Sequence, residues 1–375
     1  MTRRTRILGG TVLLFATALL TLGLVLSYDA ACPAPLPDET TATATVSAAQ
    51  SMQAARYRCY GDTGVIAWET VPRPVITDSG VLVRVHAAAT NPLDWHYMRG
   101  KPYIMRLSSG IGRPSDVRLG TDFAGVVEAV GASVTRFAPG DSVFGASSGT
   151  FGRYITVREA GAIARLPHAV SLEQAGVVAV AATTALQAVR DVGLVARGQR
   201  VLVNGASGGV GTYAVQIAKA MGAHVTGVSS TRNVEMVQLL GADTVIDYTR
   251  DDFTTSEARY DVIIDNVGNH APSALRRVLT PTGRVVMVGG PDRDRWLGPI
   301  RSFLYAAVYG WFTKQSFGTL FANTTSADLA YLATLMSQGQ LRSIIDRRFE
   351  APQLREAIAY QEAGRSRGKN VVLIP

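Results

Sequence analysis

The fold of this chain is decided by one stretch, Val201-Leu202-Val203-Asn204-Gly205-Ala206-Ser207-Gly208-Gly209-Val210-Gly211. Its first four residues form a short apolar run that is typical of a buried strand, and the glycines predict a tight turn directly after it. Apolar residues then recur at the spacing of one buried helix face, at Val210, Ala214, Ile217, Ala218 and Met221, before Gly222 ends the run. The stretch therefore predicts a strand, a glycine turn and a helix in that order.

A turn of this kind has a specific use, which is the binding of a dinucleotide. The pyrophosphate must approach backbone N–H groups at the positive end of a helix, where a Cβ atom would hold it away. Ala206, Gly208 and Gly211 take the three places of the dinucleotide-binding fingerprint, with Gly209 and Val210 between them. Glycines also occur in plain turns, so the flanking strand and helix carry this interpretation.

The residues after the turn repeat the same alternation. Strands are predicted over 224–229, 244–248, 261–267 and 284–288, and a helix over 233–240. Strands that alternate with helices indicate a parallel sheet with helices on both faces. The centre of the chain is therefore predicted to be a doubly wound α/β domain.

The end of the second predicted strand indicates which cofactor binds. An NAD enzyme normally places Asp or Glu about 20 residues beyond the glycines, where a carboxylate would repel a 2′-phosphate. This chain has Ser229, Ser230, Thr231 and Arg232 there. Hydroxyls and a guanidinium suit a phosphate, so NADPH is the predicted cofactor. The alternative is that Arg232 is only a solvated residue of the next helix.

Several motifs outside the glycine turn follow the order found in one family. They are Asn91-Pro92-Leu93-Asp94, Gly120-Thr121-Asp122-Phe123-Ala124-Gly125-Val126-Val127, Pro139-Gly140-Asp141-Ser142-Val143-Phe144-Gly145 and Thr183-Thr184-Ala185. With them, residues 52–375 resemble the quinone oxidoreductase-like medium-chain dehydrogenases/reductases. The resemblance implies a GroES-like β-barrel catalytic domain over 52–175, a Rossmann NADPH-binding domain over 176–313, and a segment over 314–375 that returns to the catalytic domain. Short apolar runs at 81–86, 125–130 and 370–374 agree with this layout.

The same resemblance implies a site without zinc. Zinc-dependent alcohol dehydrogenases of the superfamily hold the metal with a Cys and a His-Glu pair, whereas this chain has Asn91 in the region of the Cys and Asp122-Phe123 in the place of the pair. The resemblance places Asn91, Asp94, Tyr97 and Tyr103 around the substrate cleft. Asn91 is the first predicted donor to the substrate oxygen, and either tyrosine is the second donor or proton source. Asp94 is predicted to hold loop geometry, and each tyrosine could equally be a packing residue.

Further cofactor residues follow from the resemblance. It implies contacts near the nicotinamide, at the pyrophosphate turn, at the 2′-phosphate and along the strand ends, by Thr183, Thr184, Val210, Ser230, Arg232, Tyr248, Asn266, Val288 and Gly289. Core packing is the alternative for Val210 and Val288. The resemblance also makes a homodimer an expectation.

The N-terminus carries a long apolar segment. Residues 7–26 contain no charge and follow Arg3, Arg4 and Arg6, which predicts a transmembrane anchor over 1–28 with its N-terminus in the cytoplasm, although a cleaved signal segment is the alternative. Residues 29–51 are predicted to be a flexible linker.

Cys32 and Cys59 are predicted to be two isolated thiols, with pairing in an oxidising compartment as the alternative. Five scattered histidines indicate no metal site.

The net charge and one aromatic segment limit the functions that the chain can have. The net charge of +8 comes from scattered residues without a nucleic-acid module, so no nucleic-acid binding is expected. An aromatic segment over 296–321 could line an apolar pocket, lie on a membrane, join subunits or simply be buried. The leading hypothesis is NADPH-dependent reduction of an apolar quinone, enone or aldehyde. The alternatives are NADP-linked alcohol oxidation and a non-catalytic NADPH-binding sensor or scaffold.

Overall fold

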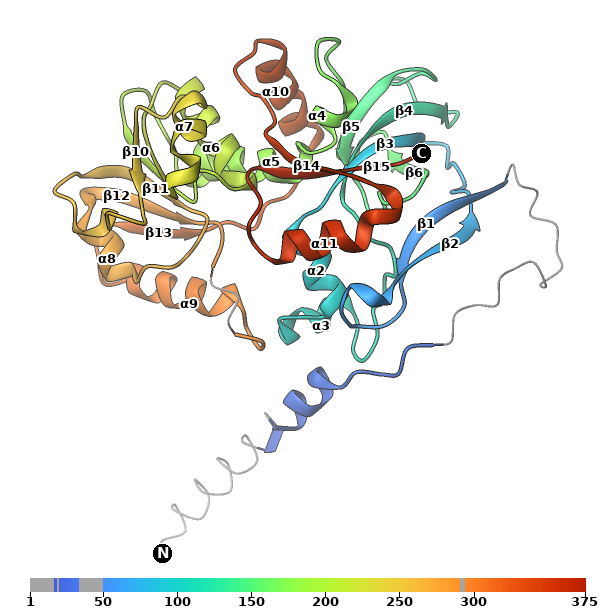
Figure 1. Ribbon diagram of the computed structural model, residues 1–375, viewed down its shortest axis with the longest axis horizontal. Helices are drawn as coiled ribbons and strands as arrows, with labels where there is room; N and C mark the ends of the chain where they lie inside the picture. Colours follow the sequence, from blue (N-terminus) through green and yellow to red (C-terminus); the bar gives the residue numbers. More distant parts are fainter. Residues whose placement is uncertain (1–16, 19, 34–49, 291–293) are drawn as a thin grey trace, which may run out of the picture.

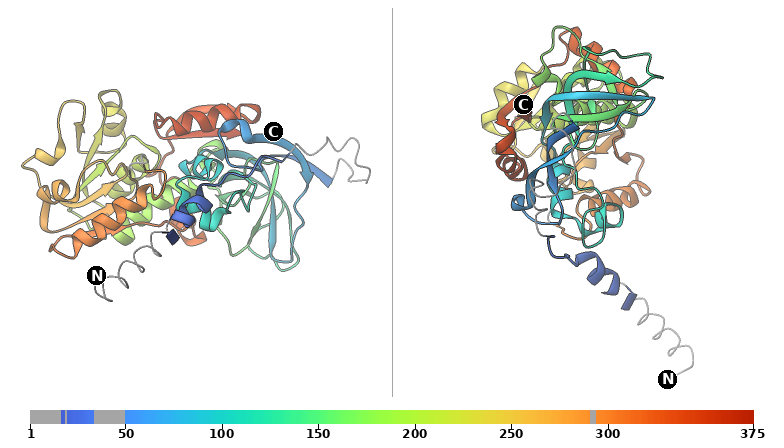
Figure 2. Two further views of the ribbon diagram at one scale, coloured as in Figure 1. Left: turned by 90° about the horizontal axis from the view of Figure 1, so that it is seen from below. Right: turned by 90° about the vertical axis from the view of Figure 1, so that its right-hand side faces the viewer.

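The computed structural model describes residues 17, 18, 20–33, 50–290 and 294–375. Two sheets form the body of the protein, one built mainly from the middle of the chain and the other mainly from its first half (Figure 1). The two sheets occupy opposite ends of the molecule when it is viewed from below (Figure 2). The α/β architecture predicted from the glycine stretch is therefore confirmed.

The first sheet is parallel and follows the predicted alternation. Its six strands run in the order β10-β9-β8-β11-β12-β13. They are β8 (Arg200–Asn204), β9 (His224–Ser229), β10 (Thr244–Asp247), β11 (Tyr260–Asp265), β12 (Leu279–Met287) and β13 (Ser316–Thr319). The order reverses at β8, because β9 lies on one side of it and β11 on the other. In doubly wound sheets this point of reversal is where a ligand binds.

Helices cover both faces of this sheet because successive side chains of each buried strand point to opposite faces. Val201 and Val203 of β8 face the cluster with α6 (Gly209–Ala220), whereas Leu202 faces the cluster with α8 and α9. The other helices around this sheet are α5 (Ala179–Gln187), which precedes β8, and α7 (Val234–Leu239), α8 (Pro272–Arg277), α9 (Pro299–Gly310) and α10 (Ser326–Ser337), which follow later strands. This arrangement is the predicted doubly wound, Rossmann-like sheet.

The second sheet is mainly antiparallel and runs in the order β14-β15-β3-β4-β5-β7, with β6 paired to β3. Its strands are β3 (Gly80–Ala89), β4 (Asp122–Val130), β5 (Ser142–Ala146), β6 (Tyr154–Arg158), β7 (Ile163–Arg165), β14 (Ile345–Glu350) and β15 (Lys369–Leu373). A hairpin of β1 (Ser51–Tyr57) and β2 (Ile66–Pro72) and the helices α2 (Pro92–Arg99), α3 (Arg106–Ser109), α4 (Leu172–Ala175) and α11 (Leu354–Glu362) complete this part. The C-terminal strand β15 pairs with β3, so the end of the chain returns to the GroES-like part.

The aromatic segment over 296–321 contains the elements α9 and β13. Strand β13 pairs with β12 at the edge of the parallel sheet. Phe303, Ala306 and Phe317 are buried there, but Trp311 and Phe312 are each 81% exposed. The interpretation that the aromatic segment is simply buried therefore holds for Phe303 and Phe317 but not for Trp311 and Phe312.

The prediction of a membrane anchor needs correction. Residues 7–16 and 19 of the predicted helix lie outside the described residues, and residues 20–27 are helical. In the described part of the chain, every helix is too short or too polar to cross a bilayer. The predicted transmembrane helix and the membrane-anchored localisation are corrected on this finding.

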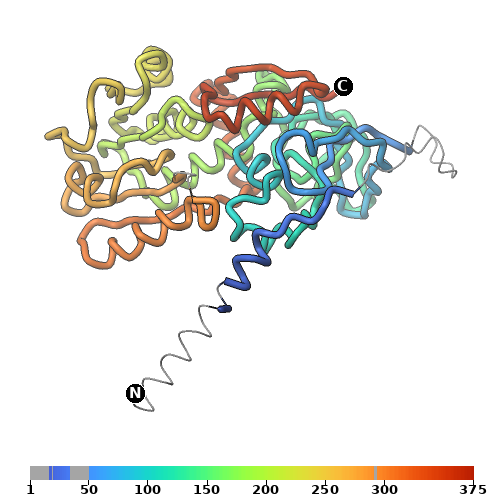
Figure 3. Tube along the Cα trace, turned by 60° about the horizontal axis from the view of Figure 1, so that its bottom comes forward, coloured from blue at the N-terminus to red at the C-terminus, as the bar shows by residue number. Residues whose placement is uncertain are grey.

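The residues that follow this helix are bound to the GroES-like part. The side chain of Arg106 is buried and donates to the carbonyl oxygens of Leu26 and Tyr28, at 2.9 and 3.0 Å, and to the carboxylate of Asp29 at 2.7 Å. Figure 3 shows these N-terminal residues running onto the part of the chain that carries α2 and α3. The start of the predicted linker is thus held in place.

The two cysteines are joined. Cys32 and Cys59 form a disulfide with a Cα–Cα distance of 5.1 Å. The prediction of two isolated thiols is therefore wrong, because the Arg106 contacts bring residue 32 next to the strand end that precedes residue 59. The bridge fastens the N-terminal segment to the GroES-like part at a second point.

Candidate active site

A cleft of about 1140 Å³ opens where the two sheets meet. The glycine turn and the carboxyl ends of the parallel strands form one wall, and the start of α2, the start of β15 and the loop after α11 form the other. The predicted site residues that line it are Asn91, Thr184, Gly208, Gly209, Val210, Gly211, Ser230, Arg232, Tyr248, Asn266 and Val288. The structure therefore brings most of the predicted cofactor residues to one surface.

The glycine turn connects β8 to α6 without any obstructing side chain. Gly205 has a φ of 75°, which a residue with a Cβ rarely adopts. A Cβ on Gly211 would clash with the carbonyl oxygen of Gly205, so the first turn of α6 packs against the loop only because residue 211 is glycine. Ala206 is fully buried beneath the turn and does not line the cleft. The N-terminus of α6 thus presents backbone N–H groups to the cleft, as a pyrophosphate requires.

The loop after β9 lies at the far end of the cleft. Ser230, Arg232 and Tyr248 all line it, and the residues 229–233 contain no carboxylate. The guanidinium of Arg232 donates to the carbonyl oxygen of Arg365 at 3.0 Å, and Arg365 also lines the cleft. Two arginines and two hydroxyl side chains in one place form a donor set that fits a phosphate group.

The middle of the cleft lies against the carboxyl ends of β11 and β12. Asn266 donates its side-chain N–H to the carbonyl oxygen of Asn204 at 2.9 Å, while its buried Oδ1 has no partner among the described residues. Thr184 donates its hydroxyl to Val180 at 2.7 Å. Thr183 and Gly289 do not line the cleft, although the buried hydroxyl of Thr183 also has no partner in the described chain. The unpartnered oxygen of Asn266 suits a ligand that carries N–H groups, such as a carboxamide.

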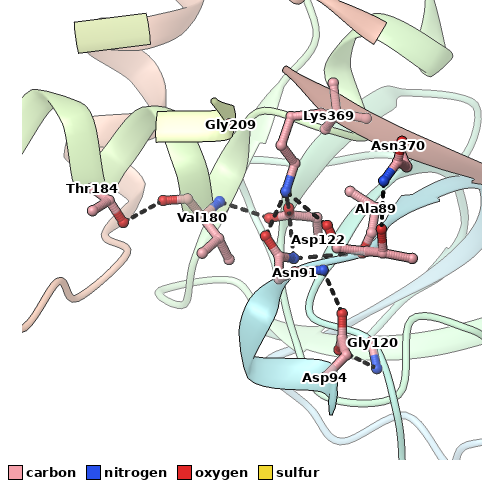
Figure 4. Close-up of polar contacts among 12 residues, drawn as sticks. Ala89, Asn91, Asp94, Gly120, Asp122, Val180, Thr184, Gly209, Lys369 and Asn370 are labelled. Carbon is pink, nitrogen blue, oxygen red and sulfur yellow. Dashed lines mark hydrogen bonds and ion pairs between the residues drawn. The ribbon is translucent and has the colours of Figure 1, made fainter. Parts of the chain in front are cut away.

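A buried polar cluster stands between this region and α2 (Figure 4). It consists of Asn91, Asp94, Asp122 and Lys369, and we refer to it as the Asn91 centre. Asn91 donates its side-chain N–H to Asp122 at 3.1 Å and accepts from the Lys369 ammonium at 2.5 Å. The Asp122 carboxylate lies 3.5 Å from the same ammonium and accepts from the backbone N–H of Val180 at 2.6 Å. Residues from the start of α2, from β4 and from β15 therefore meet at one point.

Burial dominates the electrostatics of the Asn91 centre. It raises the pKa of Asp94 to about 7, against the backbone hydrogen bonds from Asn91 and Gly120. It also raises the pKa of Asp122 and lowers the pKa of Lys369, and the attraction between these two groups offsets part of both shifts. Asp94 accepts the backbone N–H of Asn91 at 2.7 Å and does not line the cleft, a position that agrees with the prediction that it holds loop geometry.

The two predicted tyrosines lie away from the cleft wall. Tyr97 is on α2 with 39% of its surface exposed, and Tyr103 is buried. The ring of Tyr103 packs edge-on against Trp296 at a centroid distance of 5.0 Å, and the Arg106 guanidinium lies over it. The structure thus gives Tyr103 a packing position, and it brings neither tyrosine to the residues that line the cleft.

The end of the cleft beside α2 and α9 is apolar. It is lined by Leu93, Pro299, Phe303, Leu320 and Phe321. Two aromatics of the segment over 296–321 therefore line a pocket, which was one of the four interpretations of that segment. An apolar wall next to the Asn91 centre suits a substrate with a large apolar body and a polar reacting end.

Sequence reasoning missed two cationic residues of the cleft, Lys369 and Arg365. Both belong to the C-terminal segment, whereas the glycine motif and the Asn91 motif lie far from it in the chain. One signal was available, because Lys369 is a charged residue immediately before the apolar run predicted as the last strand. A charge at the start of a buried strand requires a partner, and Asp122 is that partner.

The residues of the Asn91 centre do not fit a zinc ion. Within the described residues, no three His, Cys, Asp or Glu side chains are grouped as metal ligands. The position beside Asn91 and Asp122 is taken by the Lys369 ammonium, which would repel a divalent cation. This chemistry supports the zinc-free reading of the sequence.

Comparison with known proteins places this geometry in context. Residues 77–167 match the alcohol dehydrogenase GroES-like domain, and residues 240–372 match a family described as zinc-binding dehydrogenase. The chain is 32% identical to the mouse mitochondrial NAD(P)H oxidoreductase RTN4IP1, over 84% of this chain and 87% of the relative. It is 34% identical to the trans-enoyl reductase pgmF of Aspergillus terreus, over 78% of this chain and 86% of that protein.

A solved structure extends the similarity to the whole body of the molecule. The quinone oxidoreductase from Coxiella burnetii superposes with a TM-score of 0.75 at 27% identity, covering 87% of this chain and 100% of that one. The match to the zinc-binding dehydrogenase family rests on the second half of the chain, which does not contain Asn91 or Asp122. The words zinc-binding in the family description therefore say nothing about the Asn91 centre, whose residues do not fit zinc.

Proposed function

The chain belongs to the quinone oxidoreductase-like medium-chain dehydrogenases/reductases and is an oxidoreductase that uses a nicotinamide cofactor, and we propose that it reduces a quinone, enone or aldehyde with NADPH and without zinc. One observation carries the proposal. A single cleft joins the glycine turn and Arg232 to an apolar end, and the Asn91 centre lies between them.

The residues of the cleft divide the work of holding the cofactor. The N-terminus of α6 would hold the pyrophosphate of NADPH, Arg232 and Ser230 would hold its 2′-phosphate, and Asn266 and Thr184 would hold its nicotinamide. NADPH, when bound, supplies hydride from C4 of its nicotinamide. The apolar wall of Leu93, Phe303 and Phe321 holds the apolar body of the acceptor.

Negative charge that develops on the acceptor oxygen needs a hydrogen-bond donor. Asn91 lines the cleft, and one of its side-chain N–H groups is already donated to Asp122. The other donates to the carbonyl oxygen of Ala89 at 3.5 Å, a long contact, so this N–H is the one that the acceptor oxygen takes over from Ala89. Asn91 therefore polarises the acceptor, and water that enters the cleft provides the proton.

The test uses the purified full-length chain. The oxidation of NADPH and of NADH is followed by absorbance against a panel of quinones, enones and aldehydes, with and without a chelator. We expect chelator-resistant turnover that prefers NADPH. Turnover that the chelator abolishes would overturn the zinc-free mechanism, and NADPH binding without reduction of any acceptor would overturn the enzymatic function. NADP-linked oxidation of simple alcohols, with no acceptor reduced, would replace this proposal by an alcohol dehydrogenase.

A further inference from the structure

Lys369 is the most unusual side chain of the cleft, because it carries an ammonium group yet is only 4% exposed. Its Nζ donates to the carbonyl oxygen of Thr90 at 3.1 Å and to Oδ1 of Asn91 at 2.5 Å. Asp122 balances its charge from 3.5 Å. A buried charge survives only with such partners, so the position of the ammonium is fixed by three groups at once.

The ammonium and the Asp122 carboxylate together decide which way the Asn91 amide points. An ammonium can only donate hydrogen bonds, so the amide oxygen faces it and the NH₂ group does not. The carboxylate can only accept, so the NH₂ group of Asn91 faces Asp122, to which it donates at 3.1 Å. Without the ammonium, Oδ1 of Asn91 would lose its hydrogen bond from Lys369, and the amide could rotate.

The path of the lysine side chain links this centre to the cofactor turn. The backbone N–H of Gly368 donates to the carbonyl oxygen of Ser207 at 2.9 Å, so the start of β15 is attached to the glycine turn. A Cβ on Gly209 would lie 3.1 Å from Cδ of Lys369, which means that the lysine passes directly along the turn (Figure 4). The segment that holds the cofactor and the residue that orients Asn91 are therefore in contact.

We propose that Lys369 is a positioning residue for the reaction: its ammonium holds the Asn91 amide so that one N–H points to the acceptor oxygen. The inference rests on the proposed function, in which Asn91 is the donor. Lys369 itself does not touch the acceptor. Its effect on the rate passes through Asn91, whose N–H is aimed before the acceptor arrives and needs no reorganisation during the reaction.

Substitution of Lys369 separates this role from cofactor binding. In Lys369→Met we expect kcat to fall by roughly tenfold to a hundredfold, less than for the loss of a direct oxyanion donor. The Kd of NADPH, measured by its fluorescence, stays within about twofold because the ammonium is bound to Asn91 and Asp122. Lys369→Arg keeps the charge and restores part of kcat. The matched control is Lys219→Met, which removes an ammonium paired with Asp243 far from the cleft and leaves kcat unchanged.

A double-mutant cycle tests the route through Asn91. If Lys369 acts by orienting Asn91, then Lys369→Met lowers kcat no further in a chain that already carries Asn91→Ala. Independent losses that multiply would overturn the proposal, and so would a rise in the Kd of NADPH at unchanged kcat. Loss of Lys369 leaves Asp122 buried and unpaired, so Lys369→Met/Asp122→Asn is made alongside it. This double variant removes the charges of residues 122 and 369 together, and its kcat is expected to be low as well.

One readout does not depend on turnover. A neutron diffraction structure of Lys369→Met, or of the double variant if the single variant is unstable, shows which amide atom of Asn91 faces residue 369, because the amide deuterium atoms are then located directly. We expect the amide to have rotated or to occupy two orientations. An amide that keeps its orientation would overturn the positioning role even if no acceptor is ever found, and failure of the wild type to reduce any acceptor would overturn only the proposed function.

Discussion

The glycine turn and the Asn91 centre line the same cleft but are built in opposite ways. The turn comes from one continuous segment and works through missing side chains, since a Cβ on Gly211 has no room and backbone N–H groups face the ligand. The Asn91 centre comes from three distant segments and works through buried side chains that hold each other in place. The turn is therefore sensitive to volume, and the Asn91 centre is sensitive to charge.

The largest effect is expected from added volume in the turn. Gly211→Ala forces the first turn of α6 away from Gly205, and overpacking of this kind costs about 3 kcal/mol of folding free energy. A similar loss on binding would raise the Kd of NADPH by about a hundredfold. Thermal unfolding and NADPH fluorescence measure the two effects.

Gly208→Ala is the matched control for that substitution. Its Cβ would have the carbonyl oxygen of Gly205 as its nearest neighbour at 3.5 Å, an ordinary contact, and the φ of −85° suits alanine. We expect its stability to stay within about 0.5 kcal/mol of the wild type. If Gly211→Ala unfolds at the same temperature as Gly208→Ala, the turn does not depend on the volume at residue 211.

The next effect concerns the cofactor end of the same wall. Arg232→Gln removes the guanidinium that we place on the 2′-phosphate, and a hydrogen bond to a charged group contributes about 1.5–3 kcal/mol. The KM for NADPH should rise by about 10- to 100-fold, while the KM for NADH stays the same. Arg259→Gln is the control, because among the described residues that side chain donates to the backbone carbonyls of residues 256–258, which lie outside the cleft. Equal changes for both cofactors would remove Arg232 from the phosphate site.

The same contrast explains what the sequence could predict. The turn was predicted because strand, glycines and helix adjoin along the chain, and the predicted strand over 224–229 coincides with β9. The contact between Lys369 and Asn91 spans 278 residues, and no local pattern reports it. Asn91 itself was found only because its motif resembles a family.

Charge effects were the hardest to anticipate. Asp94 is a common type of residue at the start of a helix, and only its complete burial shows that its pKa is abnormal. The disulfide between Cys32 and Cys59 was likewise beyond local reasoning, because it depends on Arg106 holding the N-terminal segment in place. Patterns of volume and period are local, whereas buried charge is a property of the assembled fold.

A smaller effect is expected from pH at the Asn91 centre. Burial raises the pKa of Asp94 to about 7 in the folded chain, above its ordinary value of 3.8, so folding favours the protonated acid. Its contribution to stability is complete below the unfolded pKa and is lost as the pH rises through about 7. The unfolding temperature should therefore drop between pH 5 and pH 8 by a few degrees more in the wild type than in Asp94→Asn.

Asp94→Asn also changes the hydrogen bonding, because its amide NH₂ group takes the place of one of the two carboxylate oxygens that accept the backbone N–H groups of Asn91 and Gly120. Asp94→Asn is thus less stable at every pH, and only the slope against pH is compared. Asp294→Asn is the control, since the backbone N–H groups of Trp296 and Leu297 lower the pKa of Asp294 and keep it ionised across this range. Parallel slopes for wild type and Asp94→Asn would show that Asp94 does not titrate in the folded chain at these pH values.

The smallest effect is expected where the two regions touch. A Cβ in Gly209→Ala would lie 3.1 Å from Cδ of Lys369, which is tighter than an ordinary contact. The lysine cannot simply swing away, because its Nζ is bound to Thr90 and Asn91. We expect kcat to fall by about twofold, because Lys369 shifts slightly and moves the Asn91 donor with it. The stability of the fold should be unchanged or slightly higher, because alanine favours the helix. In a chain with Lys369→Met the same substitution should have no effect on kcat, and a twofold loss there would show that volume at Gly209 acts on the cofactor and not through the Asn91 centre.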